Sequence, residues 1–330
     1  MKRTMLLTVF CMIIGCLLAG NALSEDAAAF YKGKTITVLI PTKPGGGFDL
    51  VSRAVGPYFE KYTESKLLMQ NGKTILSQNK LYRSKPDGLT VILAGHGAKE
   101  ITSQLFKAKG ANFDWREFTL LGRLVKSSTL FVVDKKKGWT KAADLQGKEF
   151  FHGCSRPFFG PLFAEALGWD GMKLVPGLGG GERVMGLRRG ETQSTVAGAG
   201  QVTKNLDVML PLVLTNKDPK FPDVPAVTEV ALKGKEKWAK WAGAWDEVIY
   251  WAYASPGVPK DKAAFLEGAL KKTYNDPGFR ADIQKLKFEL SPTFVGAKEL
   301  AELSSGLAKL TDAEIEEMKV VITQKYMKKK

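Results

Sequence analysis

TITVLIPTKPGGGFDLVSRAVGPYFEKY, residues 35–62, combines an apolar strand, a turn with three successive glycines and an amphipathic helix. The N–H groups at a helix N-terminus carry a partial positive charge, and glycine lets a ligand approach them closely. The turn lacks the Lys-Ser/Thr pair of a Walker loop and the G-x-G-x-x-G spacing of a dinucleotide site. We therefore interpret it as an anion-binding corner, the alternative being an ordinary strand-to-helix connection. Its candidate ligand-binding residues are Gly45, Gly46, Gly47, Phe48 and Asp49.

The first residues follow the order of a secretory signal peptide. Lys2 and Arg3 precede an uncharged apolar run, and small residues follow up to Ser24. We expect residues 1–24 to be removed and the mature chain to be exported to the periplasm. A lipid anchor at Cys16 is the alternative, because the Ile-Ile-Gly that precedes this cysteine resembles a lipidation box.

The charge pattern argues against a nucleic-acid partner, and the cysteine positions argue against an internal disulfide. The chain of 330 residues has 49 Lys and Arg against 34 Asp and Glu, a formal net charge of +15 that suits acidic ligands. The positive residues are scattered without a zinc-finger spacing or RNA-binding motif, so we expect no nucleic-acid partner. Cys11 and Cys16 fall in the signal segment, which leaves Cys154 without an internal disulfide partner. We interpret Cys154 as a small buried hydrophobe.

Strand-like and helix-like segments alternate along the whole chain, which is the pattern of an α/β protein. At this length we expect two domains with mainly parallel sheets, joined by ordered strands. A crossing near residues 130–135 and a return near residues 245–254 would place residues 25–130 and 250–330 in one lobe and residues 131–249 in the other. Two such lobes hold a ligand in the cleft between them.

Two segments carry expectations about packing. The helical pattern over residues 297–325 is expected to break at a capping box that begins at Thr311, and to pack against its own lobe. Trp238, Trp241 and Trp245 lie at helical spacing just before the return crossing. We favour a hinge core for these rings over a stacking surface for an aromatic acid.

A second strand, loop and helix unit surrounds GCSRPFFG, residues 153–160. Its loop carries Ser155, a hydroxyl donor, and Arg156, whose planar guanidinium can grip a carboxylate in a bidentate way. We interpret Gly153, Ser155 and Arg156 as a second anion-binding corner, one for each lobe. A surface salt bridge is the alternative for Arg156.

Catalysis depends on whether a base is available, and the chain has only two histidines, His96 and His152. His96 follows an apolar strand, where an imidazole could act near neutral pH. The sequence contains no G-x-S-x-G elbow, no H-E-x-x-H pair and no cysteine cluster. We therefore expect no enzyme, no cofactor and no metal site, and we interpret His96 as a pocket or core residue. An exported hydrolase is the alternative.

Six segments in a fixed order carry a resemblance to a known family. They are FYKGKTITVLIPTKPGGGFDLVSRAVGPYFEK (30–61), SKPDGLTVILAG (84–95), FDWREFTLLGRLV (113–125), LQGKEFFHGC (145–154), PDVPAVTE (222–229) and SPGVPK (255–260). Together they resemble the solute-binding proteins of tripartite tricarboxylate transporters, the Bug or TctC family. The resemblance covers nearly the whole mature chain.

The resemblance implies a type II periplasmic-binding-protein fold, with two Rossmann-like lobes joined by two hinge crossings. It also implies that the lobes close on a small organic carboxylate and deliver it to the membrane subunits of a tripartite tricarboxylate-type transporter. In this family backbone N–H groups, small hydroxyls and water hold the ligand carboxylates, so His96, Gly177 and Gly198 join the two corners as candidates by position. We expect a monomer. An exported partner-binding or sensory adaptor of the same fold is the alternative.

The sequence departs from the family in two places. QNGKTILSQN, residues 70–79, stands where relatives carry a glycine-rich Asn-x-Pro-Gly-Ala-Gly-Gly stretch. Lys43 stands where relatives carry an uncharged residue. Because both positions border the expected site, the identity of the carboxylate stays open.

Overall fold

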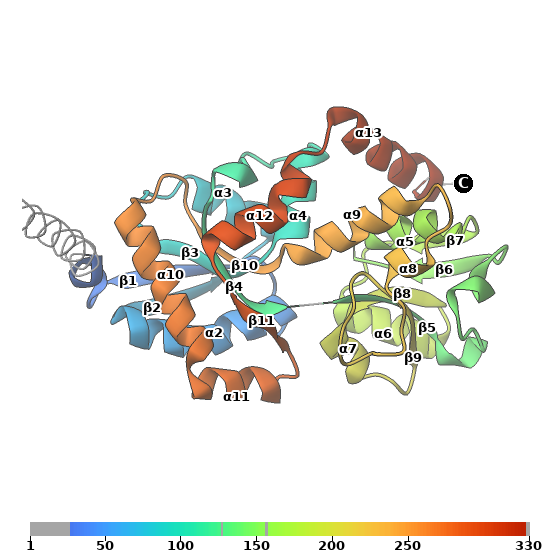
Figure 1. The fold of residues 1–330 in the computed structure, drawn as a ribbon, viewed down its shortest axis with the longest axis horizontal. Helices are drawn as coiled ribbons and strands as arrows, with labels where there is room; N and C mark the ends of the chain where they lie inside the picture. Colours follow the sequence, from blue (N-terminus) through green and yellow to red (C-terminus); the bar gives the residue numbers. More distant parts are fainter. Residues whose placement is uncertain (1–26, 127, 156–157, 328–330) are drawn as a thin grey trace, which may run out of the picture.

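A computed structural model of the chain describes residues 27–126, 128–155 and 158–327, which form two lobes, each built on one mixed sheet (Figure 1). The expected signal segment and Arg156 lie outside the described residues. Within the described ranges, no helix has the length and apolar character needed to cross a membrane.

The first lobe contains a six-stranded sheet in the order β11-β4-β10-β3-β1-β2. Its strands are β1 (Thr35–Ile40), β2 (Lys66–Asn71), β3 (Thr90–His96), β4 (Thr119–Lys126), β10 (Ile249–Ala254) and β11 (Glu289–Val295). The helices that follow or connect them are α2 (Gly47–Thr63), α3 (Thr74–Tyr82), α4 (Gly97–Leu105), α10 (Lys260–Asn275), α11 (Pro277–Lys285) and α12 (Ala297–Ala308).

The second lobe contains a five-stranded sheet in the order β7-β6-β8-β5-β9. Its strands are β5 (Thr129–Asp134), β6 (Phe150–Gly153), β7 (Met172–Val175), β8 (Ser194–Gly198) and β9 (Met209–Leu214). Its helices are α5 (Phe159–Leu167), α6 (Gly180–Arg189), α7 (Ala199–Thr203), α8 (Val227–Val230) and α9 (Glu236–Glu247). The chain ends in α13 (Asp312–Val320) and a π-helical turn, η4 (Val321–Tyr326).

The sheets are mixed, and the expectation of mainly parallel sheets was wrong. Five of the nine strand pairings in the described part of the chain are antiparallel. The reason lies in the crossings: the chain leaves the first lobe at the carboxyl end of β4 and re-enters it at the amino end of β10. These neighbouring strands must therefore run in opposite directions. The alternation of strands and helices in the sequence does not reveal the direction in which each strand runs through its sheet.

Helix α2 shows why the sequence folds this way next to the glycine turn. It begins after Gly46, which has an extended backbone, and buries Val51, Val55 and Phe59 at a spacing of four residues. These side chains belong to the apolar core beneath the first sheet, together with Val38 of β1. Because one face of the helix is held by this core, its N-terminus is fixed at the carboxyl end of β1.

The C-terminal segment, residues 312–326, lies on the second lobe, so the expectation that the C-terminal helices stay on the first lobe was wrong for this part (Figure 1). Glu165 of α5 is buried and accepts hydrogen bonds from Lys325 Nζ at 2.5 Å and Tyr326 Oη at 2.6 Å. A buried carboxylate is stable only when it is paired, and these partners come from the end of the chain. The passage from α12 to α13 thus adds a third crossing between the lobes.

Helix α9 carries the three tryptophans that the sequence places before the return crossing. Trp238, Trp241 and Trp245 are all buried in one apolar cluster that also contains Phe158. The Trp245 and Phe158 rings meet edge to face at 4.9 Å between centroids. The interpretation of these rings as hinge core is confirmed.

Candidate functional site

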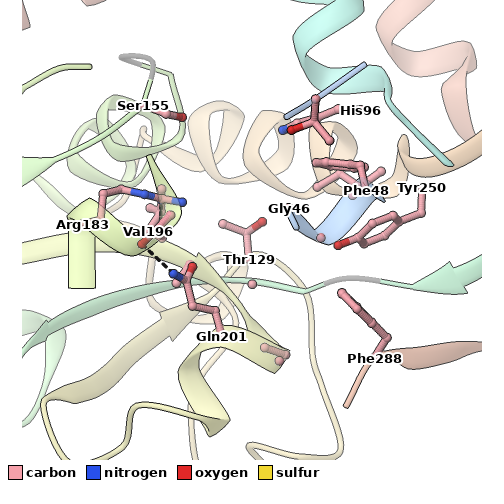
Figure 2. A pocket seen from close by; sticks show the side chains of 18 of the residues that line it. Gly46, Phe48, His96, Thr129, Ser155, Arg183, Val196, Gln201, Tyr250 and Phe288 are labelled. Atoms are coloured by element: carbon pink, nitrogen blue, oxygen red, sulfur yellow. Dashed lines mark hydrogen bonds between the residues drawn. The ribbon is translucent and has the colours of Figure 1, made fainter. Parts of the chain in front are cut away.

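A cavity of about 600 Å³ lies between the two lobes, at the ends of strands from both sheets (Figure 2). Loops after β1, β3, β6 and β8 reach it, because the carboxyl ends of neighbouring parallel strands meet at one edge of a sheet. Of the residues expected from the sequence, seven line it: Gly45, Gly46, Gly47, Phe48, His96, Ser155 and Gly198.

Three other candidates do not line the cavity. Gly153 lies inside β6, where it pairs with Val175 and Thr195 and its carbonyl accepts a hydrogen bond from the Thr195 hydroxyl at 2.7 Å. Gly177 lies in the turn that follows β7. Asp49 is buried beneath the glycine turn, with 2% of its surface exposed.

Asp49 shapes the turn. Its carboxylate accepts hydrogen bonds from the Gly45 N–H at 2.8 Å, Arg53 Nε at 2.9 Å and Asn71 Nδ2 at 2.8 Å. Burial acts to raise the pKa of Asp49, but the hydrogen bonds from Arg53, Asn71 and Gly45 outweigh it and hold this pKa below its ordinary value. Asn71 belongs to the segment that departs from the family, so this departure includes a residue that supports the turn.

The first backbone N–H groups of α2 are available as hydrogen-bond donors. The backbone N–H groups of Gly47 and Phe48 have no hydrogen-bond acceptor among the described residues, since they open the helix and Asp49 binds elsewhere. Both residues line the cavity. An anion placed here would receive N–H donors at the positive end of the helix dipole.

The second lobe repeats this arrangement at a place that the sequence reasoning missed. Gly179, Gly180 and Gly181 line the cavity and open helix α6. The Glu182 carboxylate accepts a hydrogen bond from the Gly179 N–H at 2.5 Å, as Asp49 does from Gly45. The available signal was the pattern itself, because three successive glycines and a nearby acidic residue occur in both turns.

Arg183 follows this second glycine turn and lines the cavity. Its Nη1 donates to the carbonyl of Val196, whereas its buried Nε has no hydrogen-bond partner. No ion pair joins Arg183 to a carboxylate in the described ranges of the chain. Burial lowers the pKa of this guanidinium from its ordinary value. The sequence reasoning did not single out this residue.

The titratable groups behind Arg183 are neutral at pH 7. Burial, and then the charge of Arg183, lower the pKa of His152 to about 3, and its Nδ1 lies 3.0 Å from Ser194 Oγ. Burial raises the pKa of the Cys154 thiol to about 11. The interpretation of Cys154 as a buried side chain is confirmed, since 2% of its surface is exposed.

Aromatic rings form the wall of the cavity that belongs to the first lobe (Figure 2). The Phe48 ring lies between His96 and Tyr250, with ring centroids 4.6 Å and 4.7 Å away. Phe288 meets Tyr250 edge to face at 5.8 Å. Tyr250 has a backbone φ of 62°, a costly conformation for a bulky residue that persists where surrounding contacts enforce it. We name Phe48, Tyr250 and Phe288 the aromatic wall.

The charged side chains of the lining are mostly cationic. Lys99, Lys126, Arg183, Lys204 and Lys220 line the cavity, against the single carboxylate of Glu289 among the described residues. The Lys220 ammonium lies 3.8 Å from the Glu289 carboxylate and so joins the two lobes at the rim. Burial and the nearby Asp218 raise the pKa of Glu289 above its ordinary value. No group of three His, Cys, Asp or Glu side chains in the described part could hold a metal ion.

Solved structures of TctC and Bug solute-binding proteins share this fold. A TctC solute-binding protein from Polaromonas is 16% identical, with 89% of this chain and 99% of its own covered at a TM-score of 0.65. The periplasmic binding protein BugD is 17% identical, with 88% and 98% covered at a TM-score of 0.66. MatC from Rhodopseudomonas palustris, solved with bound malate, is 22% identical, with 88% and 99% covered at a TM-score of 0.61.

Neither a protein-family model nor a curated protein matches the sequence. The structural likeness thus confirms the expected two-lobed binding-protein fold, and the structural neighbours are those that the sequence resemblance indicated.

Proposed function

We propose that the protein is an extracytoplasmic solute-binding protein that captures a small organic carboxylate between its lobes and delivers it to the membrane subunits of a tripartite tricarboxylate-type transporter. The observation that carries the proposal is the meeting of two glycine turns across one cationic cavity. Each turn opens a helix towards the cavity and offers N–H donors to an anion.

Capture follows from the chemistry of the lining. A carboxylate at Gly47 and Phe48 receives charge-assisted hydrogen bonds, which are stronger than neutral ones and gain further when water is excluded. Rotation of the lobes about the segments that join β4 to β5 and α9 to β10 closes the cavity on its ligand. The closed form then differs in shape from the empty one, and a membrane subunit can recognise that difference.

The structural neighbours support the ligand class and the compartment. One is described as a periplasmic binding protein and another was solved with malate. Malate is a small dicarboxylate, and a dicarboxylate can place one charged group at each glycine turn. Periplasmic location also agrees with the signal peptide expected from residues 1–24.

A binding screen tests the proposal. The chain from Glu25 is purified, unfolded and refolded to remove carried-over ligand, and its melting temperature is measured with mono-, di- and tricarboxylates and with their neutral amides. A ligand that binds the native state raises the melting temperature by mass action. We expect one or a few acids to stabilise the protein and their amides to do so much less. Stabilisation by no acid would contradict the proposal.

Delivery needs a separate test in cells. Uptake of the radiolabelled acid found in the screen is measured in cells with and without the gene for this chain. We expect uptake to depend on the gene and to be restored by the exported protein. Equal uptake in both strains would contradict a role in transport and leave carboxylate binding in place.

A further inference from the structure

We infer that Arg183 is the residue that makes the cavity select for negative charge: its guanidinium binds a carboxylate of the ligand from the second lobe. The inference rests on the proposed function and deepens it by assigning charge selection to one side chain. It starts from an electrostatic imbalance in the lining of the cavity.

The first part of that imbalance is a half-buried cation, with a fully buried Nε, that has no counter-ion among the described residues. The Arg183 guanidinium donates a hydrogen bond to the carbonyl of Val196, and in the described part of the chain it forms no ion pair. Its nearest titratable neighbours, His152 and Cys154, are neutral at pH 7. Burying a charge without a partner is costly, and an arriving anion would offset that cost.

The second part is the position of Arg183 at the start of a helix. Helix α6 begins at Gly180, so Arg183 lies near the positive end of the helix dipole, where cations are disfavoured. The Glu182 carboxylate accepts a hydrogen bond from the Gly179 N–H and forms no ion pair with Arg183. An anion between the guanidinium and the N–H groups of Gly180 and Gly181 would satisfy both the cation and the helix end.

Two of the other cations of the lining, Lys204 and Lys220, differ from Arg183. Lys204 and Lys220 are exposed to solvent, and Lys220 already pairs with Glu289. Exposed ammonium groups attract anions to the mouth of the cavity, but water screens them and their contribution to affinity is small. Arg183 is held by Val196 and also has the planar fork that matches a carboxylate.

The opposite side of the cavity indicates what the carboxylate is attached to. Figure 2 shows Arg183 on one side and the aromatic wall of Phe48, Tyr250 and Phe288 on the other. An apolar or ring-shaped body gains from contact with such a wall. The ligand class is therefore an acid whose carboxylate binds Arg183 and whose apolar body packs on the aromatic wall.

The binding experiment compares Arg183→Gln with the wild-type chain. Isothermal titration calorimetry is run with malate, adipate, benzoate and phenylacetate and with the corresponding amides. For each acid that binds the wild type, we expect R183Q to weaken binding at least about tenfold, because a hydrogen-bonded charge is lost. Binding of the amide should change less than about twofold. Arg188→Gln on the same helix is the matched control, since Arg188 pairs with the surface carboxylate of Asp207, and should bind like the wild type.

The melting temperature of the ligand-free protein provides a second readout that does not need a ligand. Because Arg183 carries an uncompensated charge, R183Q should melt at the same or a higher temperature than the wild type. Arg183→Lys keeps the charge and loses the fork, so its affinity for the acid should lie between those of the wild type and R183Q.

Each outcome decides the question. Wild-type affinity of R183Q for the acids, or an equal loss for acid and amide, overturns the inference and leaves the proposed function intact. A ligand-free R183Q that melts lower or fails to fold also overturns it, because Arg183 would then be a structural residue. Binding of none of the four acids to the wild type counts against both the inference and the proposed function.

Discussion

Thr129 and Asp246 are joined by two hydrogen bonds at the point where the chain passes between the lobes. The Thr129 N–H donates to Asp246 Oδ2 at 3.0 Å, and the Thr129 hydroxyl donates to Oδ1 at 2.7 Å. The Thr215 hydroxyl also donates to Oδ2, at 2.6 Å. Thr129 begins β5 and Asp246 lies near the end of α9, so one buried carboxylate ties the first crossing to the return crossing.

Asp246 predicts a pH dependence of stability. Burial raises the pKa of this carboxyl from 3.8 to about 6, against hydrogen bonds from Thr215 and Thr129. An acid whose pKa is higher in the folded state stabilises the fold at low pH and loses that contribution as pH rises through the two values. We expect the component of the unfolding free energy that depends on Asp246 to fall between about pH 4 and 6.

Urea unfolding at several pH values measures this component by comparison with Asp246→Asn. The difference in unfolding free energy between the wild type and D246N should change between about pH 4 and 6 and level off at higher pH. Asp207→Asn is the control, because Asp207 is exposed and Arg188 lowers its pKa, which gives a dependence of the opposite sign. If the difference in unfolding free energy between the wild type and D246N does not change with pH, the prediction of a raised pKa for Asp246 is wrong.

Gly47→Ala is expected to weaken ligand binding and leave the fold intact. A Cβ atom on Gly47 would lie 3.0 Å from the Tyr250 hydroxyl, which would have to give by a few tenths of an ångström, and 3.6 Å from the Phe288 ring, an ordinary van der Waals contact. Overpacking of this kind costs about 1–3 kcal/mol, and we expect a loss of affinity of about tenfold, measured by calorimetry. Gly268→Ala, in open space on α10, is the matched control and should bind normally. Unchanged affinity of G47A would show that the ligand does not use this side of the cavity.

Glu165→Ala should loosen the C-terminal segment from the second lobe. The substitution removes the carboxylate that binds the Tyr326 hydroxyl and the Lys325 ammonium, and Lys325 keeps its ion pair with Asp170. Breaking a fully buried pair costs about 3–5 kcal/mol, and since Lys325 is partly exposed we expect roughly 1–3 kcal/mol in urea unfolding. Hydrogen exchange of residues 312–326 should rise at the same time. Glu316→Ala, on the exposed face of α13, is the control, and an equal effect of both substitutions would contradict the prediction.

Phe288→Ala should discriminate between ligands by their shape. Phe288 belongs to the aromatic wall, and its removal takes apolar area from a ligand that packs there. We expect the affinity for benzoate or phenylacetate to fall more than the affinity for malate, by at least about threefold in the ratio of Kd values. Phe151→Ala, on an exposed ring of β6, is the control. An equal loss for all acids would show that Phe288 shapes the cavity without contacting the ligand body.

Several local features could be predicted because they depend on residues a few positions apart. The glycine turn and the start of α2 lie where the sequence indicates. The capping box at Thr311 is present, with the Glu314 N–H donating to the Thr311 hydroxyl at 3.2 Å. Seven of the candidate site residues line the cavity for the same reason, since they follow the carboxyl ends of recognisable strands.

The second-lobe part of the site could be predicted only in outline. A glycine turn was expected there, but Gly153 is engaged in the sheet and the turn at Gly179, Gly180 and Gly181 opens the helix that faces the cavity. The repeated pattern of three glycines and an acidic residue was a usable signal. Nothing in the sequence distinguishes Arg183 from the other 48 Lys and Arg residues as a half-buried cation without a carboxylate partner among the described residues.

By itself, the sequence determined the α/β class, the glycine turn of the first lobe, the ends of several helices and the likeness to binding proteins. These properties depend on short stretches of chain and on their order. Only the tertiary structure decided the direction of β10, the docking of the C-terminal segment on Glu165, the tie between Thr129 and Asp246, and the burial of the Arg183 Nε without a partner. Each of these depends on contacts between residues far apart in the chain, whose free energy comes from burial and pairing and leaves no local pattern in the sequence.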